Sequence, residues 1–130
     1  GSLDSFSIDN VGNTIDLSKS FTSIAPLTLR VTVGHGTGSG GPLTVTESIT
    51  NNTGQAWTDY HLEIFEPGEN EGVVFTAFQQ STLGGFTLEN APASGPRNLD
   101  FLGDLADGAT TEAVFTLSLP DPGAGNTYTF

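Results

Sequence analysis

The loop at residues 66–72 gathers oxygen ligands of the kind that bind divalent cations. Glu66, Glu69 and Glu71 supply three carboxylates, and Asn70 adds an amide. Calcium takes six to eight oxygen ligands from such groups and from backbone carbonyls. The Asp-x-Asp-x-Asp-Gly spacing of an EF-hand is missing. The loop therefore predicts half of a calcium site, and a solvated acidic loop is the alternative.

Asp100, Asp104 and Asp107 form a second, looser set of carboxylates, which we include among the predicted calcium ligands. Asp100 lies between Leu99 and Phe101, so the outer face of a strand explains its position equally well.

Asp59, His61 and Glu63 follow one another at every second position. On a strand such side chains share one side, so an imidazole between two carboxylates is a candidate transition-metal site. Catalytic zinc usually takes three ligands, commonly His-rich, and the other histidine, His35, lies in a glycine-rich loop. An exposed polar strand face is the alternative interpretation.

Trp57 and Tyr60 are the candidate ligand-binding residues, because exposed aromatic rings stack on sugars in many β-sandwich domains. A single Trp after a turn is also typical of a sandwich core. Both interpretations remain open at this stage.

Signatures of catalysis are missing. The chain has no Cys and no Gly-x-Ser-x-Gly elbow, and its glycine-rich loop at 34–41 lacks the Gly-Lys-Ser/Thr ending of a phosphate-binding loop. We therefore expect a protein that is not an enzyme. A small hydrolase that uses a pair of carboxylates is the remaining catalytic alternative.

Strand-like alternation dominates the elements that must position these residues, and no helix is predicted. Short turn-bounded runs recur about every ten residues, which is typical of an antiparallel sandwich. We predict an all-β, immunoglobulin-like (Greek key) β-sandwich of about seven to nine strands, with a barrel or jelly roll as the alternative. The expected runs are 27–33, 43–49, 57–65, 73–78, 85–88, 98–102, 113–119 and a last strand from Tyr128, with edge strands around 6–8 and 15–24.

Charge excludes some partners. With 3 Lys+Arg against 15 Asp+Glu, the chain has a formal net charge of −12 and cannot neutralise a row of phosphates, so we expect no nucleic acid. No run approaches the roughly 18 apolar residues of a membrane span, so we expect no membrane insertion. The acidic, Lys-poor composition favours an extracellular or cell-surface location.

The ends suggest an excised domain. We interpret Gly1-Ser2 as a cloning scar and residues 3–130 as a single domain of a longer protein, whose other domains would be partners.

Two stretches carry a family resemblance. The run ITNNTGQAWTDYH at 49–61, and the closing pattern with Phe115-Thr116-Leu117 before Pro120-Asp121 and Tyr128-Thr129-Phe130 after it, resemble immunoglobulin-like sandwich modules of bacterial exported proteins. Such modules occur beside sorting signals or glycine-rich calcium-binding repeats. The resemblance implies a non-catalytic module for adhesion or surface assembly, with a polysaccharide or a surface protein as partner, but no calcium repeat is present here.

Lys19 is the only lysine. Some bacterial surface sandwiches join a Lys to an Asn through an isopeptide bond beside a buried acid. Glu47 or Glu63 is the candidate acid here, although nothing in the spacing requires such a bond.

Overall fold

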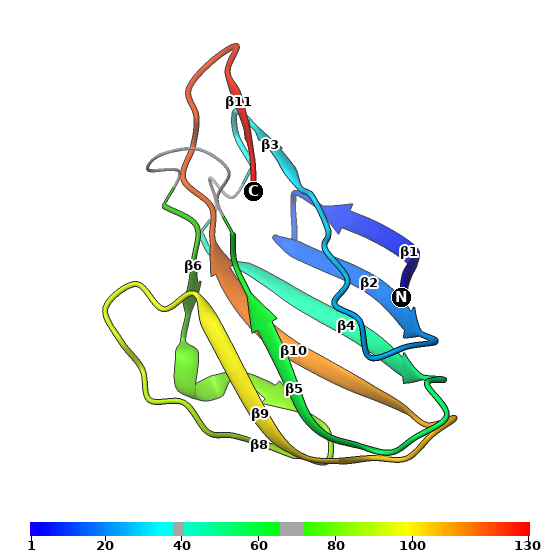
Figure 1. The fold of residues 1–130 in the computed structure, drawn as a ribbon. Helices are drawn as coiled ribbons and strands as arrows, with labels where there is room; N and C mark the ends of the chain where they lie inside the picture. The colour runs from blue at the N-terminus through cyan, green and yellow to red at the C-terminus, as the bar shows by residue number, and fades with distance from the viewer. Residues whose placement is uncertain (38–40, 66–71) are drawn as a thin grey trace.

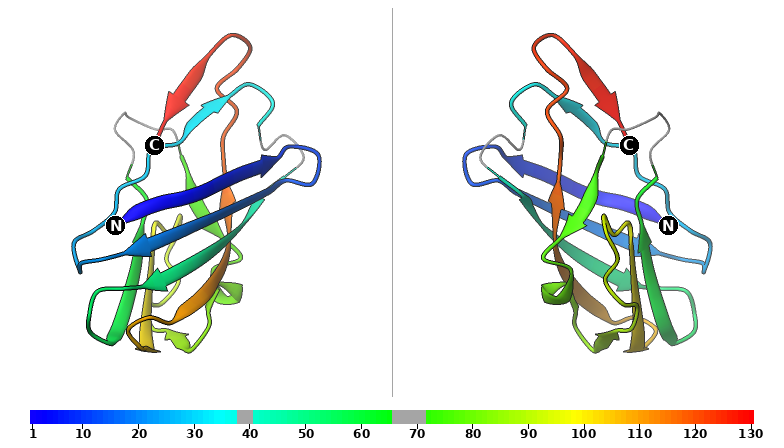
Figure 2. Two further views of the ribbon diagram at one scale, coloured as in Figure 1. Left: turned by 90° about the vertical axis from the view of Figure 1, so that its right-hand side faces the viewer. Right: turned by 90° about the vertical axis from the view of Figure 1, so that its left-hand side faces the viewer.

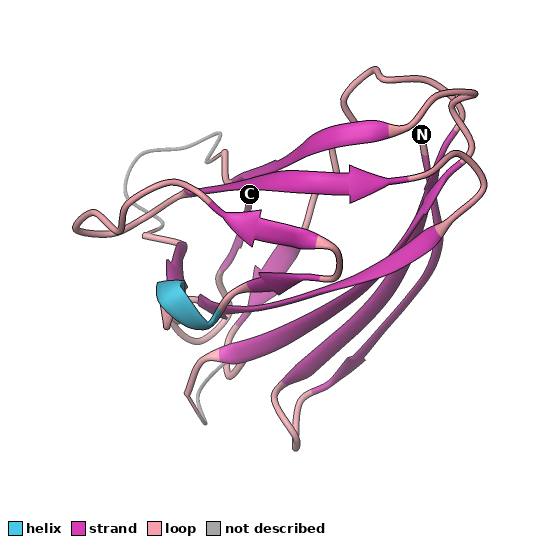
Figure 3. Ribbon diagram, turned by 90° about the horizontal axis from the view of Figure 1, so that it is seen from below, coloured by secondary structure: helices cyan, strands magenta, loops and turns pink. Residues whose placement is uncertain are grey.

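The structure is a computed structural model that describes residues 1–37, 41–65 and 72–130. Its described part contains eleven β-strands and one short 3-10 turn, η1 (Phe78–Gln80). The predicted all-β sandwich is confirmed, with more strands than expected. Figure 3 shows its two layers from below.

The larger sheet forms the back layer in Figure 1. Its neighbours are antiparallel except for β2 and β4, which run parallel, so the sheet is mixed. Parallel neighbours need a crossover connection, which residues 22–42 provide. The strand order is β1 (Ser2–Asp9), β2 (Thr14–Phe21), β4 (Leu43–Asn51), β10 (Thr110–Ser118), β6 (Val74–Thr76), and β7 (Thr82–Leu83) also pairs with β10.

The front layer is a three-stranded antiparallel sheet with β9 at its centre and β5 at one edge. A separate pair, β3 and β11, lies at one end of the molecule (Figure 2). The strands of these two groups are β5 (Trp57–Glu63), β8 (Phe86–Leu88) and β9 (Asn98–Leu105), then β3 (Thr32–Gly34) and β11 (Thr127–Thr129).

The core lies between the layers and follows the alternation of the sequence. On β10 the expected inner row of Ala113, Phe115 and Leu117 is buried, and Leu119 continues it past the strand. Phe101 of β9 is 1 % exposed and is the largest fully buried side chain. Period-two burial on both layers is the expected signature of two sheets packed face to face.

Two expectations about strands were wrong. The run 27–33 was predicted to be one strand, but the strand begins only at Thr32, and residues 26–30 have no backbone partner among the described residues. The run 15–24 was predicted at an edge, but β2 lies between β1 and β4. The edge is β1, and its inner row of Leu3, Phe6 and Ile8 is 42–47 % exposed.

Candidate functional site

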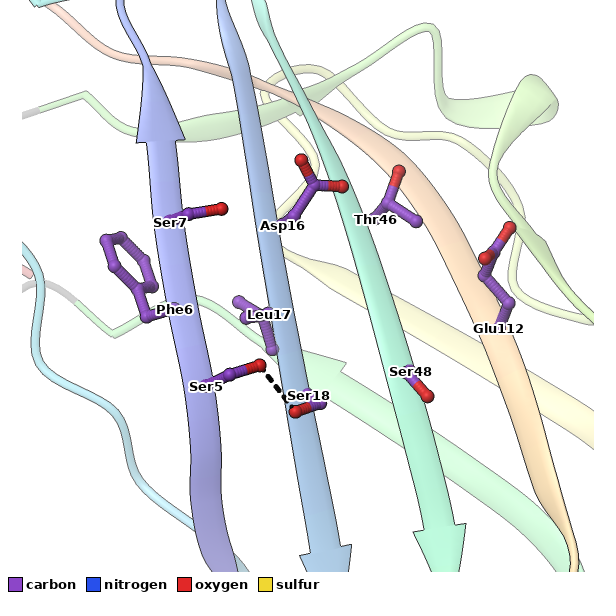
Figure 4. A pocket seen from close by; sticks show the side chains of 9 residues that line it. All are labelled: Ser5, Phe6, Ser7, Asp16, Leu17, Ser18, Thr46, Ser48 and Glu112. Atoms are coloured by element: carbon purple, nitrogen blue, oxygen red, sulfur yellow. Dashed lines mark hydrogen bonds between the residues drawn. The ribbon is translucent and has the colours of Figure 1, made fainter.

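The outer face of the larger sheet is polar and nearly flat. Figure 4 shows a shallow hollow of about 320 Å³ in which hydroxyl and carboxylate side chains line up across four strands. Phe6 and Leu17 belong to the opposite, inner rows of their strands. The hollow contains two carboxylates, Asp16 and Glu112, and no histidine, and it offers no buried polar group for a ligand.

The inner face carries a much larger cleft, of about 790 Å³. Its floor is formed by β2, β4 and β10, one wall is β5, and the other wall is the segment 23–31. In Figure 1 this segment and β5 both lie in front of the larger sheet. Three large apolar residues at the opening are strongly exposed: Phe6 at 47 %, Ile24 at 74 % and Phe65 at 62 %.

A buried ion pair lies on the floor of the cleft. Lys19 Nζ is 2.9 Å from Glu47 Oε1 and 3.0 Å from Oε2, and the two side chains are 7 % and 5 % exposed. The pair forms because β2 and β4 are parallel neighbours, and Lys19 and Glu47 belong to their inner rows. One of the two acids proposed for Lys19 therefore contacts it.

The isopeptide hypothesis gains no second partner from this geometry. Asn51, on the same strand as Glu47, donates its amide to the carbonyls of Gln55 and Leu105 at 2.8 and 3.1 Å. Its side-chain oxygen accepts from Thr53 N and Oγ1. Asn51 is therefore fully used in closing the turn between β4 and β5.

Burial governs the protonation of the floor. Burial raises the pKa of Glu47, and the charge and hydrogen bond of Lys19 oppose part of that rise. Burial also raises the pKa of Tyr60, with a further contribution from the negative charge of Glu47. The floor therefore has hydrogen-bond donors on Lys19 and Tyr60 and an acceptor on Glu47. It carries no net charge when Lys19 and Glu47 are both ionised.

Three aromatic rings form the β5 side of the cleft. Trp57 stacks on Tyr60, with centroids 5.8 Å apart and planes at 20°. Phe21 meets both rings edge-on, at 5.4 and 6.3 Å. Trp57 Nε1 donates to Thr53 Oγ1 at 3.2 Å. The two predicted ligand-binding residues are thus partly buried, pack on the core and line the cleft.

A short turn holds this aromatic group in place. Gly54 has φ +85°, a conformation that favours glycine, and its N–H donates to Asp107 Oδ1 at 2.9 Å. Together with the Asn51 bonds, this contact fixes the start of β5 and so the position of Trp57. The NNTG run, singled out for its resemblance, has a clear structural role.

His61 lies on the outward face of β5 between two carboxylates. Its Nδ1 is 2.7 Å from Asp100 Oδ1 and its Nε2 is 2.9 Å from Asp59 Oδ2. These two hydrogen bonds, to Asp100 first, raise the pKa of His61. The predicted set contained Asp59 and Glu63, so Asp100 of the neighbouring strand was missed because cross-strand register is not visible in the sequence.

The predicted calcium ligands have different outcomes. Glu66, Glu69, Asn70 and Glu71 lie outside the described residues. Asp100 contacts His61 and Asp107 caps the turn at Gly54, at opposite ends of β9, with Asp104 between. At about 3.3 Å per strand residue the ends are roughly 20 Å apart, so the three aspartates do not form one site. In the described ranges no group of three or more His, Asp or Glu side chains is arranged to hold a metal ion.

His35, the other histidine, contacts the loop before β11. Its Nδ1 is 2.9 Å from Asp121 Oδ1, at an exposed position. The N–H of Gly123, and secondly His35, lower the pKa of Asp121. This contact joins two loops and lies outside the cleft.

The chain matches no known protein family, and comparisons with curated proteins and with solved structures find no similar chain. Among the described residues there is no helix of the length and apolar character that a membrane crossing needs.

Proposed function

We propose that this domain is a non-catalytic binding module that takes up part of a partner in the cleft between its sheets. By this contact it would serve adhesion or surface assembly at the cell surface or outside the cell. The observation that supports the proposal is the open apolar cleft. Folding normally covers such surface, and uncovered apolar patches rimmed by polar residues are typical of interaction sites.

The lining favours an apolar, uncharged contact in the cleft. Floor and walls are mainly aliphatic and aromatic, and the one buried charge pair is internally balanced. A ligand charge placed on the floor would compete with Lys19 or Glu47 for its partner, which is costly in a buried setting. Groups that both donate and accept hydrogen bonds suit this floor best.

The test uses Nile red, a neutral apolar dye, with the emission of Trp57 as a second signal. Trp57 is the only tryptophan and lines the cleft, so its emission reports occupancy. We expect saturable dye binding that Ile24→Glu and Phe65→Glu weaken. Val11→Glu and Leu102→Glu are matched controls, because both residues are exposed, at 96 % and 51 %, and neither lines the cleft.

Dye binding that is absent, or that all four variants change equally, would contradict the proposal. A soluble polysaccharide that changes Trp57 emission while Nile red does not bind would favour the carbohydrate-binding alternative instead. The Tm of each variant, compared with that of wild type, checks that the substitutions at the opening of the cleft leave the fold intact.

Calcium enters as a separate proposal. Residues 66–71 would bind calcium and stabilise the domain. A comparison of Tm with calcium and with EDTA tests this without knowledge of the partner.

A further inference from the structure

Strand β5 has an unpaired backbone edge that faces the cleft. His61 is opposite Asp100 of β9, and Asp100 directs both backbone groups to the other side: its N–H donates to Asn90 Oδ1 and its C=O accepts from Glu89 N. Opposed residues of an antiparallel pair either exchange both bonds or point both sets of groups away. The N–H and C=O of His61 therefore point away from β9.

Glu63 follows the same pattern two residues later. Its partner Asn98 directs its carbonyl to the Asn90 side chain, and the next residue, Ile64, donates to Arg97 on the β9 side, as alternation requires. Within the described chain, no backbone hydrogen bond satisfies His61 or Glu63 on the cleft side. Unpaired edges of this kind are templates for another strand.

The opposite wall is equally unpaired. Residues 26–30 have no assigned secondary structure and make no backbone hydrogen bond to the described residues. Leu27 and Leu29 are partly buried, whereas Thr28 and Arg30 are exposed, as in a strand of the front layer. The segment thus has the alternation of a strand, and it lines the same cleft as the unpaired edge of β5.

At one end of the cleft, the wall segment already pairs with the chain that follows β11. Val31 and Phe130 exchange both backbone hydrogen bonds, at 2.9 and 3.0 Å, so the chain from β11 runs antiparallel to the wall segment. Phe130 itself lines the cleft. A strand that continued the line of β11 past Phe130 would therefore run antiparallel to the wall segment, with its backbone groups placed for pairing.

We propose that the cleft accepts an extended strand from a partner protein, antiparallel to β5, which completes the front sheet. The inference rests on the proposed function and names the class of partner. A strand residue in a two-layer sheet takes about 160 Å³, from spacings of about 3.3, 4.8 and 10 Å. The cleft of about 790 Å³ therefore holds about five residues of strand.

Register sets the chemistry of this strand. Residues opposite His61 and Glu63 share their outward face, where Asp59 and Glu63 are exposed, so Lys, Arg or Thr is favoured there. Residues opposite Tyr60 and Leu62 face the floor and are apolar. A basic, alternating strand also complements the net charge of −12.

The experiment fuses an eight-residue strand that alternates Val with Lys and Thr to Phe130 of the full chain through a Gly-Ser linker. Tethering raises the effective concentration to the millimolar range, so weak pairing is detected. The matched control fusion replaces every Val by Ser and keeps length and charge. Readouts are Tm, Trp57 emission and amide hydrogen exchange resolved by residue.

We expect the Val fusion to raise Tm above the control and to slow amide exchange at His61 and Glu63 at least about tenfold. The free acetylated and amidated peptide at millimolar concentration is expected to give the same protection, and its Lys→Glu version less. Equal exchange in the two fusions overturns the inference. Protection by the fused strand but not by the free peptide rules out a strand supplied by a partner.

Failure here is distinguishable from failure of the proposed function. If Nile red binds in the cleft while His61 and Glu63 stay unprotected, the cleft binds apolar molecules but does not pair with a strand. If neither ligand binds, both proposals are wrong.

Discussion

Replacing Lys19 by Met would leave the carboxylate of Glu47 buried without its counter-charge. Because the two side chains are only 7 % and 5 % exposed, solvent screens the pair little. Removing one partner of a buried pair typically costs about 3–5 kcal/mol. For a chain of this length that corresponds to a Tm lower by about 10–25 °C at pH 7.

Replacing Glu47 by Gln is expected to cost much less. The folded protein holds a proton on Glu47 more tightly than the unfolded chain does, because burial raises its pKa from the ordinary value of 4.5. Gln resembles the protonated acid and still accepts a hydrogen bond from Lys19, whose ammonium loses its counter-charge, so we expect a loss of about 1–2 kcal/mol. The double variant Lys19→Met/Glu47→Leu should be as stable as wild type or more stable.

The stability lost in Lys19→Met depends on pH. An acid whose pKa is raised on folding contributes stability that is complete below its unfolded pKa and is lost as the pH rises through its folded pKa. Without Lys19 the pKa of Glu47 rises further. The deficit of Lys19→Met relative to wild type therefore shrinks as the pH falls from 7 towards 4.5.

Urea unfolding followed by Trp57 fluorescence measures these differences, with m-values compared to confirm two-state behaviour. The reasoning is refuted if Lys19→Met costs less than about 1 kcal/mol, if Glu47→Gln costs as much as Lys19→Met, or if the deficit does not depend on pH.

The other predictions concern the turn, the outer face and the acidic loop. Asn51→Ala should lower the free energy of unfolding by about 2–3 kcal/mol in urea, because buried backbone groups lose their partner. His61→Gln should remove a stabilisation of less than about 1 kcal/mol, present below pH 6.5 and lost as the pH rises through the raised pKa, measured as Tm at pH 5.5 and 8.5. Millimolar calcium should raise Tm relative to EDTA at fixed ionic strength, and replacing Glu66, Glu69 and Glu71 by Gln should abolish the rise.

Each of these has a matched control. Asn52→Ala changes the exposed neighbour and should be nearly neutral; a similar loss at both positions would contradict the role of Asn51. His35→Gln removes the other histidine and serves as the control for His61→Gln. If Tm of His61→Gln depends on pH as it does in wild type, the contacts of His61 with the two carboxylates do not cause that dependence. A calcium effect that survives in the Gln variant would place the ion elsewhere.

Period-two alternation was sufficient to predict which face of a strand is buried. The inner row of Tyr60 and Leu62 on β5, with Ile64 just past its end, is covered to a greater extent than its outer neighbours, as expected from residue type alone. Alternation also marked Leu27 and Leu29 as inward-facing, and they are. It did not show that this run lacks a partner, because pairing depends on what lies alongside in space and not on the run itself.

The site was less predictable for the same reason. The Lys19–Glu47 pair depends on a parallel pairing of β2 with β4 across 28 residues, and the contact of His61 with Asp100 spans 39. Spacing identified His61 as a residue of interest, and residue type alone identified Lys19 and Trp57. Their partners required the register of the sheets.

The ion pair and the unpaired edge are parts of one cleft, so they should be coupled. A strand seated against β5 would cover the floor and remove water from Glu47, which already faces Lys19 and Tyr60. Further desolvation raises the pKa of Glu47 in the complex, so binding takes up protons and affinity increases as the pH falls. We expect this pH dependence in the His61→Gln background, where the imidazole of the outer face is absent, and its loss when Glu47→Gln is added. Binding of the free peptide that is equally pH-dependent in both backgrounds would show that the strand does not reach the floor.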